Sequence, residues 1–203
     1  MTGQELSALL SRHRVALILG IIVILLGAMG FFGYEKYQRH QIEKAAVLYN
    51  ELADTMLQGQ NSTARASAET LIDHYAHTPY GIMARFFLAR LDVESKQIPA
   101  AEKTLSAVME NASAPRGMRS LARMYLARLY VDQHQPQKAL GLLQKTDPAF
   151  ASVADEIKGD AYASLKQVSK ADQAYHTAMK ALPETDPYRT YLQMKIANIG
   201  VAP

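Results

Sequence analysis

The sequence predicts an all-α protein in which one apolar N-terminal helix is followed by a solenoid of paired helices. Three observations lead to this fold class. A run of 20 residues carries no charged side chain. Alanine, leucine, tyrosine and methionine then recur at spacings of three and four, with prolines between the runs. No stretch shows the sustained alternation that is typical of strands. We therefore expect helices and no sheet.

The first element is the apolar run VALILGIIVILLGAMGFFGY at residues 15–34. At about 1.5 Å of rise per residue it forms a helix of roughly 30 Å, which matches the hydrocarbon thickness of a bilayer. We predict a transmembrane helix at residues 15–34, a short cytosolic tail at residues 1–14 and a water-soluble domain at residues 35–203.

The apolar run also has a competing interpretation as a cleaved signal peptide, because Ala28 and Gly30 offer the small residues that a signal peptidase accepts. Retention is favoured because the run continues through Phe31 and Phe32. The basic residues on the two flanks do not decide the orientation. Since long C-terminal domains are translocated largely regardless of charge, we expect the N-terminus in the cytosol and the domain across the membrane.

The domain is expected to contain nine helices, each defined by apolar residues at helical spacing. The first continues the apolar helix without a break, since residues 35–41 contain neither glycine nor proline. In chain order the predicted helices are residues 38–57, 63–75, 82–95, 100–111, 116–133, 137–145, 152–165, 169–182 and 188–199.

Three successive helix pairs show an internal repeat. In each pair a small residue in the first helix is followed twelve residues later by alanine, where two antiparallel helices approach closely. A large apolar residue follows four positions after that alanine. The repeat-packing residues are Ala89 and Ala101, Ala127 and Ala139, and Gly159 and Ala171, and the large residues are Leu105, Leu143 and Tyr175. The periods of 38 and 32 bracket the roughly 34 residues of a tetratricopeptide repeat.

The fold prediction is therefore a tetratricopeptide-repeat-like solenoid with residues 188–199 as a C-terminal capping helix. The alternative is a generic alanine-rich bundle. Three features depart from the repeat pattern: tryptophan is absent, and Asp92 and Lys158 stand where apolar or aromatic residues are usual. The helices before Pro79 fit only loosely, and we interpret them as a degenerate first repeat.

A partner-binding groove is predicted on the concave surface, which the first helix of each pair lines in such repeats. The positions one after and three before the small residue are expected to point inward. These residues are Phe86, Arg90, Met124, Arg128, Glu156 and Asp160. Basic and apolar character in two repeats gives way to acidic character in the third. The alternative is that these side chains are packed by the chain's own helices.

Two further groups of residues are candidates for contacts. Small residues on one side of the apolar helix would let another membrane helix approach closely, although glycine is also simply common in membrane helices. These residues are Ala16, Gly20, Gly27 and Gly30. In the domain, Arg116, Arg119 and Arg123 lie on overlapping faces of one helix. They form either a solvated face or a contact for anionic lipid headgroups or an acidic partner.

Catalytic, metal and cofactor sites find no support in the sequence. The six histidines form no cluster with ligand spacing, and there is no cysteine. Neither a G-x-x-x-x-G-K-[ST] nor a G-x-G-x-x-G loop is present. The charge of the domain is nearly balanced, which gives no indication of nucleic-acid binding. We expect no enzyme activity and no cofactor.

Four segments carry a resemblance to a known family over nearly the whole chain. They are TPYGIMARFFLARL, MYLARLYVDQHQPQKALGLLQKTD, FASVADEIKGDAYASL and the C-terminal LQMKIANI. Together with the order of parts, they resemble the YfgM-like ancillary subunits of the bacterial SecYEG translocon.

The resemblance implies a single-pass inner-membrane protein with a periplasmic domain. It further implies association with the SecYEG translocon and with a membrane-anchored periplasmic chaperone of the PpiD type, in assistance to newly exported client proteins. The alternative is a repeat adaptor of another envelope machine, for cell division or outer-membrane assembly.

Overall fold

The computed structural model describes the backbone of residues 3–199 and the side chains of residues 19, 20 and 22–199. Its described part is all-α and contains no strand, as the sequence predicts. The helices are α1 (Gly3–Leu57), α2 (Asn61–His74), α3 (Pro79–Glu94), α4 (Ile98–Glu110), α5 (Arg116–Asp132), α6 (Pro136–Leu142), α7 (Ala151–Ser164), α8 (Val168–Lys180) and α9 (Tyr188–Asn198), with the 3-10 turn η1 (Pro148–Phe150) before α7.

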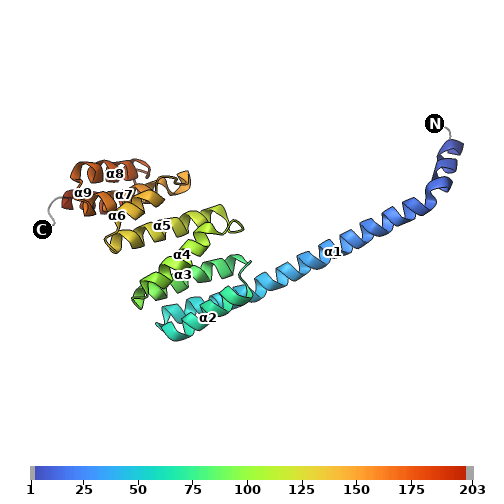
Figure 1. Cartoon of the computed structure of the whole chain (residues 1–203), viewed down its shortest axis with the longest axis horizontal. Coiled ribbons are helices and arrows are strands. Elements are labelled where there is room, and N and C mark those ends of the chain that lie inside the picture. Colours follow the sequence, from blue (N-terminus) through green and yellow to red (C-terminus); the bar gives the residue numbers. More distant parts are fainter. Residues whose placement is uncertain (1–2, 200–203) are drawn as a thin grey trace.

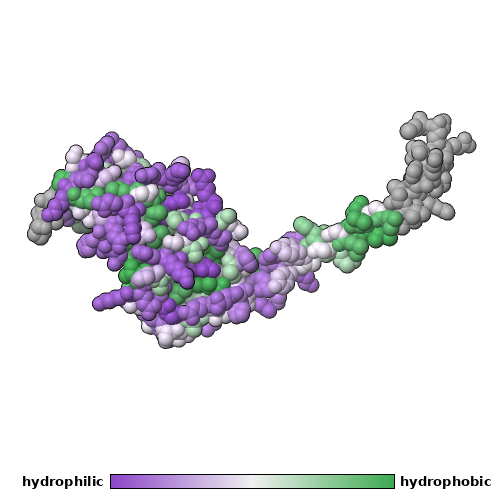
Figure 2. Space-filling view, in the orientation of Figure 1, coloured by the Kyte–Doolittle hydropathy of each residue, from purple (hydrophilic) through white to green (hydrophobic). Residues whose placement is uncertain are grey.

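Helix α1 is a single helix of 55 residues that projects far beyond the domain (Figure 1). It passes through residues 35–41 without a break, as expected. Figure 2 shows an apolar band on the projecting part, where large side chains such as Ile24, Phe31 and Phe32 are exposed.

Within the part of the chain that the structure describes, none of the helices contains a stretch with the length and hydropathy of a membrane span. Of the predicted transmembrane residues 15–34, the side chains of residues 15–18 and 21 lie outside the described set. Of the predicted tail at residues 1–14, no side chain is described.

The described part of the domain is a row of four antiparallel helix pairs capped by α9 (Figure 1). The C-terminal part of α1 pairs with α2, and α3 with α4, α5 with α6 and α7 with α8 follow. The predicted degenerate first repeat is thus the α1–α2 pair. Helix α1 also contacts α3, α5 also contacts α7, and Phe86 of α3 packs against Tyr125 of α5, so the core is a series of small apolar clusters between neighbouring pairs.

The same turn joins the two helices of every pair. The middle of its three residues has positive φ and is Gly59, Lys96, His134 or Lys166. A glutamine follows and donates its backbone N–H to the carbonyl five residues earlier, at 2.7–2.9 Å in all four turns. This is the Schellman ending of a helix. Its presence at Gly59 supports the α1–α2 pair as a true repeat unit.

The small residues of the repeat lie at close helix contacts. Ala101, Ala127, Ala139 and Ala171 have no exposed surface. The site of Gly159 is tighter still, because a Cβ placed there would lie 2.4 Å from a ring carbon of Tyr175. Close approach therefore requires glycine at that position while Tyr175 keeps its place.

The two charged departures from the repeat pattern have partners in the structure. The buried carboxylate of Asp92 lies 2.7 Å from a guanidinium nitrogen of Arg65, which belongs to the preceding helix α2. The Lys158 ammonium lies 2.8 Å from Asp155, one turn earlier on α7. Asp92 therefore joins two neighbouring pairs, whereas Lys158 is held within its own helix.

Helix ends differ from the prediction where capping decides them. Helix α3 begins at Pro79 instead of residue 82, because the Thr78 hydroxyl accepts the Gly81 N–H at 3.1 Å and proline suits the first helical position. Helix α6 ends at Leu142 instead of residue 145. There the Thr146 hydroxyl donates to the Leu143 carbonyl, and Pro148 follows.

Candidate partner-binding groove

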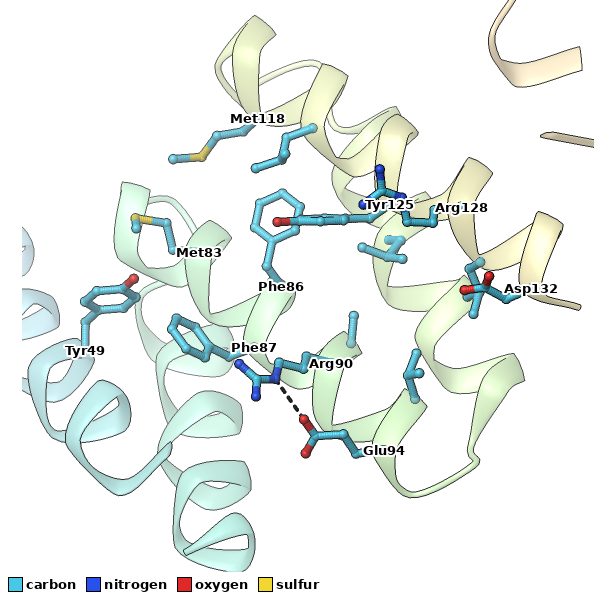
Figure 3. Close-up of a pocket in the computed structure, with 15 residues that line it drawn as sticks. Tyr49, Met83, Phe86, Phe87, Arg90, Glu94, Met118, Tyr125, Arg128 and Asp132 are labelled. Atoms are coloured by element: carbon cyan, nitrogen blue, oxygen red, sulfur yellow. Dashed lines mark hydrogen bonds and ion pairs between the residues drawn. The ribbon is translucent and has the colours of Figure 1, made fainter. Parts of the chain in front are cut away.

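A hollow of about 660 Å³ lies between the first helices of three successive pairs, α1, α3 and α5 (Figure 3). Most of its lining is aromatic, methionine or aliphatic, and the charged residues lie toward one end. We call this hollow the groove; it is lined by Tyr49, Met83, Phe86, Phe87, Ala89, Arg90, Val93, Glu94, Leu105, Met118, Leu121, Tyr125, Arg128, Leu129 and Asp132.

The wall formed by α3 follows from helical periodicity. Met83, Phe86, Phe87 and Arg90 stand at spacings of three, four and seven, which places them on one face of α3. Phe87 packs edge to face against Tyr49 of α1, with ring centroids 5.7 Å apart. The face of α3 thereby closes one side of the groove against α1.

The opposite wall is formed by α5. Tyr125 meets Phe86 edge to face, with ring centroids 5.6 Å apart, across the groove floor (Figure 3). Tyr125 is 46% exposed, although it is a large aromatic side chain. Met83 and Met118 lie on the two walls at the same end (Figure 3). Methionine is flexible and polarizable, so this end can adapt its shape to an apolar ligand.

The charged end carries one ion pair across a single turn. Arg90 Nε donates to Glu94 Oε1 at 2.8 Å, and the Arg90 side chain stays 67% exposed (Figure 3). Asp132 stands at the same end, and burial raises its pKa above the ordinary value. The groove thus offers an apolar floor with cation and carboxylate groups at its rim, an arrangement that can bind an amphipathic segment.

The structure brings together only half of the six predicted groove residues. Phe86, Arg90 and Arg128 line the groove. Met124 does not, because it is 2% exposed and packs with Ala127, Leu143 and Ile157 in the core between α5, α6 and α7.

Glu156 and Asp160 form a separate ion cluster that α9 covers. Lys195 of α9 donates to Glu156 at 2.8 Å and to both oxygens of Asp160 at 2.6 Å. Tyr188 of α9 donates its hydroxyl to Glu156 at 2.7 Å. From α8, Tyr175 donates to Asp160 at 2.6 Å. The predicted acidic end of the groove is therefore closed by the chain's own capping helix.

Arg128 connects the ion cluster to the groove. Its Nη2 lies 3.0 Å from Glu156 Oε2, while its side chain remains 44% exposed. Burial alone would lower the pKa of Arg128, but Glu156 and Tyr188 reverse that effect and raise it. Burial likewise opposes the charge on Lys195, but the hydrogen bonds that its ammonium donates to Asp160 and Glu156 outweigh this effect and raise the pKa of Lys195. Both cations therefore stay charged.

Three of the four small residues predicted on the apolar helix have open space beside them among the described residues. A Cβ built at Gly20, Gly27 or Gly30 would meet nothing within 4 Å, and Ala16 lies among the residues whose side chains are not described. A helix contact there stays a prediction. Within the described residues, no group of three or more potential ligands is placed to hold a metal ion.

Sequence reasoning missed most of the groove's apolar lining. Met118, Leu121 and Tyr125 stand at spacings of three and four on α5, so the helical stripe is present in the sequence. A stripe of this kind is also what a buried helix face shows, and only the arrangement of α1, α3 and α5 leaves it open.

A family model described as a tetratricopeptide repeat-like domain matches residues 9–201. The chain belongs to this family. Three relatives are each named as an ancillary SecYEG translocon subunit. That of Neisseria gonorrhoeae is 28% identical over 182 residues and covers 87% of both chains. That of Aggregatibacter actinomycetemcomitans is 26% identical over 87% of this chain and 88% of its own. The relative from Haemophilus influenzae is 23% identical over 75% and 70%.

These relatives confirm the resemblance to ancillary translocon subunits that the four sequence segments indicate. No solved structure matches the chain. The tetratricopeptide repeat-like family explains the paired helices, and the region of the match includes all four pairs and the capping helix.

Proposed function

We propose that this chain is a non-enzymatic, membrane-anchored repeat protein that binds partner proteins at the Sec translocon. The observation that carries the proposal is the open groove, where Phe86, Tyr125 and the methionines offer apolar surface that the chain's own helices leave uncovered. Aromatic side chains in a concave site are the usual anchors of protein interfaces. The three relatives, each named as an ancillary SecYEG translocon subunit, support the translocon as the place of action.

In this proposal, residues 15–34 anchor the chain in the inner membrane, residues 1–14 stay in the cytosol and residues 35–203 lie in the periplasm. Support comes from the apolar run and from the exposed apolar side chains on the projecting part of α1. The groove then stands where segments of exported proteins emerge. A periplasmic chaperone of the PpiD type and newly exported clients are the proposed further partners.

The test is a pull-down of the full chain from detergent-solubilised membranes of its native host, with partners identified by mass spectrometry. The groove variant is Tyr125→Glu with Arg90→Glu, since both side chains are largely exposed and neither supports the core. The matched control is Val168→Glu with Lys180→Glu on α8. It places the same charge change on an exposed apolar residue and an exposed cation away from the groove.

We expect the unaltered chain and the control variant to recover the translocon subunits and the chaperone, and the groove variant to lose most of the recovery. Circular dichroism of each variant shows whether the helices are intact. Equal recovery by the groove variant would overturn the role of the groove. Absence of every translocon subunit from the partners of the unaltered chain would overturn the place of action.

A further inference from the structure

A second hollow, of about 350 Å³, lies on the side of α5 that faces away from the groove. The groove takes Leu121, Tyr125 and Arg128 from α5, whereas this hollow takes Arg116, Arg119 and Arg123. At about 100° per residue these two sets point in roughly opposite directions from the helix axis. We call the second hollow the basic pocket; its charged lining consists of Arg116, Arg119, Arg123, Lys145 and Asp147.

The basic pocket holds more positive charge than the chain itself neutralises. Asp147 is occupied, because its Oδ2 lies 2.9 Å from Arg116 Nε and its Oδ1 accepts the N–H of Ala149 at 3.2 Å. Arg123 donates to the backbone carbonyl of Lys145 at 3.3 Å. Among the side chains that the structure describes, no carboxylate lies within ion-pair distance of Arg119, Arg123 or Lys145. Cations gathered in this way attract an anion from outside the chain.

The topology of the row fixes where this pocket faces. Helix α1 enters the domain from its apolar N-terminal part, and every following helix reverses direction. The ends of α4 and α6 and the beginning of α5 therefore point back toward the apolar part of α1. Figure 1 shows the connection between α4 and α5 at the end of α5 that faces the projecting part of α1. Arg116 begins α5 and Lys145 follows α6, so the pocket lies at this end.

We propose that the basic pocket binds the phosphate of anionic phospholipid headgroups at the membrane surface from which α1 emerges. The inference rests on the membrane anchor of the proposed function. A guanidinium group can donate two parallel hydrogen bonds to the oxygens of one phosphate. Basic residues are also attracted to an anionic membrane surface when they lie within about a Debye length of it. A docking protein is the weaker occupant. Met109 is the one large apolar residue in the lining, so the pocket lacks the aromatic anchors that the groove provides.

The experiment measures how closely the pocket approaches the lipid surface. The chain contains no cysteine, so Ser113→Cys in the exposed connection before α5 gives a single site for a fluorophore. The full chain is reconstituted in vesicles of phosphatidylcholine, with or without roughly one third phosphatidylglycerol. A headgroup-attached nitroxide lipid then quenches the fluorophore. We expect quenching to increase about two-fold or more with phosphatidylglycerol and to fall back at high salt.

The test variant is Arg119→Glu with Arg123→Glu. The control is Lys96→Glu with Lys166→Glu, which makes the same charge change at exposed turns at the other end of the helix pairs. The test variant should lose the increase and the control should keep it. Equal quenching in both lipid mixtures, or equal loss in both variants, would overturn the proposal. The proposal would also be overturned if an acidic protein, added alone to neutral vesicles, produced the same increase in quenching.

Failure of the anchor is detected separately, by flotation of the same vesicles after washing with alkaline carbonate. A chain that leaves neutral vesicles at this step lacks the anchor. For such a chain, cosedimentation with the phosphatidylglycerol vesicles compares the same two double variants. If the variant Arg119→Glu with Arg123→Glu no longer binds these vesicles and the control variant still does, the result supports the pocket without the anchor. Equal binding of the two double variants overturns the pocket.

Discussion

Gly159→Ala tests the close helix contact between α7 and α8. A methyl group at this position would stand 2.4, 2.5 and 2.9 Å from three ring atoms of Tyr175. The ring cannot easily move aside, because Tyr175 is 3% exposed and its hydroxyl is 2.6 Å from Asp160. Overpacking of this kind costs typically about 1–3 kcal/mol, and these distances favour the upper end. Replacing a helical glycine by alanine returns about 1 kcal/mol. The expected net loss is about 2 kcal/mol.

The assay is thermal and urea unfolding of the full chain in detergent, followed by circular dichroism. A loss of about 2 kcal/mol should lower the melting midpoint by about 4–8 °C. Gly141→Ala is the matched control, because a Cβ at Gly141 meets nothing within 4 Å. It should raise stability by a few tenths to about 1 kcal/mol.

A second substitution separates the ring contact from other effects. The other two repeats combine alanine at the small position with leucine at the large one, as in Ala89 with Leu105 and Ala127 with Leu143. Adding Tyr175→Leu to Gly159→Ala recreates that combination, so most of the cost of Gly159→Ala should disappear in the double variant. If Gly159→Ala stabilises the chain as Gly141→Ala does, the proposed contact does not limit the spacing of α7 and α8.

Two further predictions concern the ion cluster under α9. Lys195→Met leaves the almost fully buried Glu156 with one cation fewer, so it should lower the free energy of unfolding by about 2–4 kcal/mol. The loss of hydrogen-exchange protection should be concentrated in α7–α9, and unchanged protection there would contradict the prediction. The second prediction follows from the raised pKa values of Tyr188 and Lys195. Burial, and then the hydrogen bond to Glu156, raise the pKa of Tyr188 from 10.0 to about 12. The pKa of Lys195 is also raised from 10.5. A group whose pKa is higher in the folded than in the unfolded protein contributes its full stabilisation below the unfolded pKa and loses it as the pH rises. The free energy of unfolding should therefore fall as the pH rises from about 10 to 12, and it should fall less steeply in Tyr188→Phe. Parallel pH profiles for the two proteins would refute this.

The helices were predictable because each depends on its own residues. Apolar spacing located all nine, and their ends shifted by at most three residues where a cap such as Thr78 decided the boundary. The shared turn was also present in the sequence, as a glutamine eight residues after each small position at Gln97, Gln135 and Gln167. It escaped notice because a glutamine in a polar turn has no distinctive chemistry until the four backbone conformations are seen together.

The groove was only partly predictable because its residues depend on what covers them. Of the residues chosen by their position on the helix, Phe86, Arg90 and Arg128 line one hollow. The same rule failed for Met124, which turns into the core against the next pair, since α6 and α7 fill the space beside it. Periodicity gives the direction of a side chain only to within the width of a helix face. Residues within one such face can line a groove or lie in the core, so periodicity alone does not distinguish the two.

The different fates of Arg90 and Glu156 follow from the end of the solenoid. A pair inside the row has its apolar face covered by the next pair. In the described part of the chain, α9 takes that place beside α7 and α8. Leu192 supplies the apolar cover, with no exposed surface among Ala171, Tyr175 and Ala178. One turn later on the same helix, Lys195 reaches Glu156 and Asp160. The acids of the third repeat therefore complement the capping helix, and the open groove lies on the pairs before it.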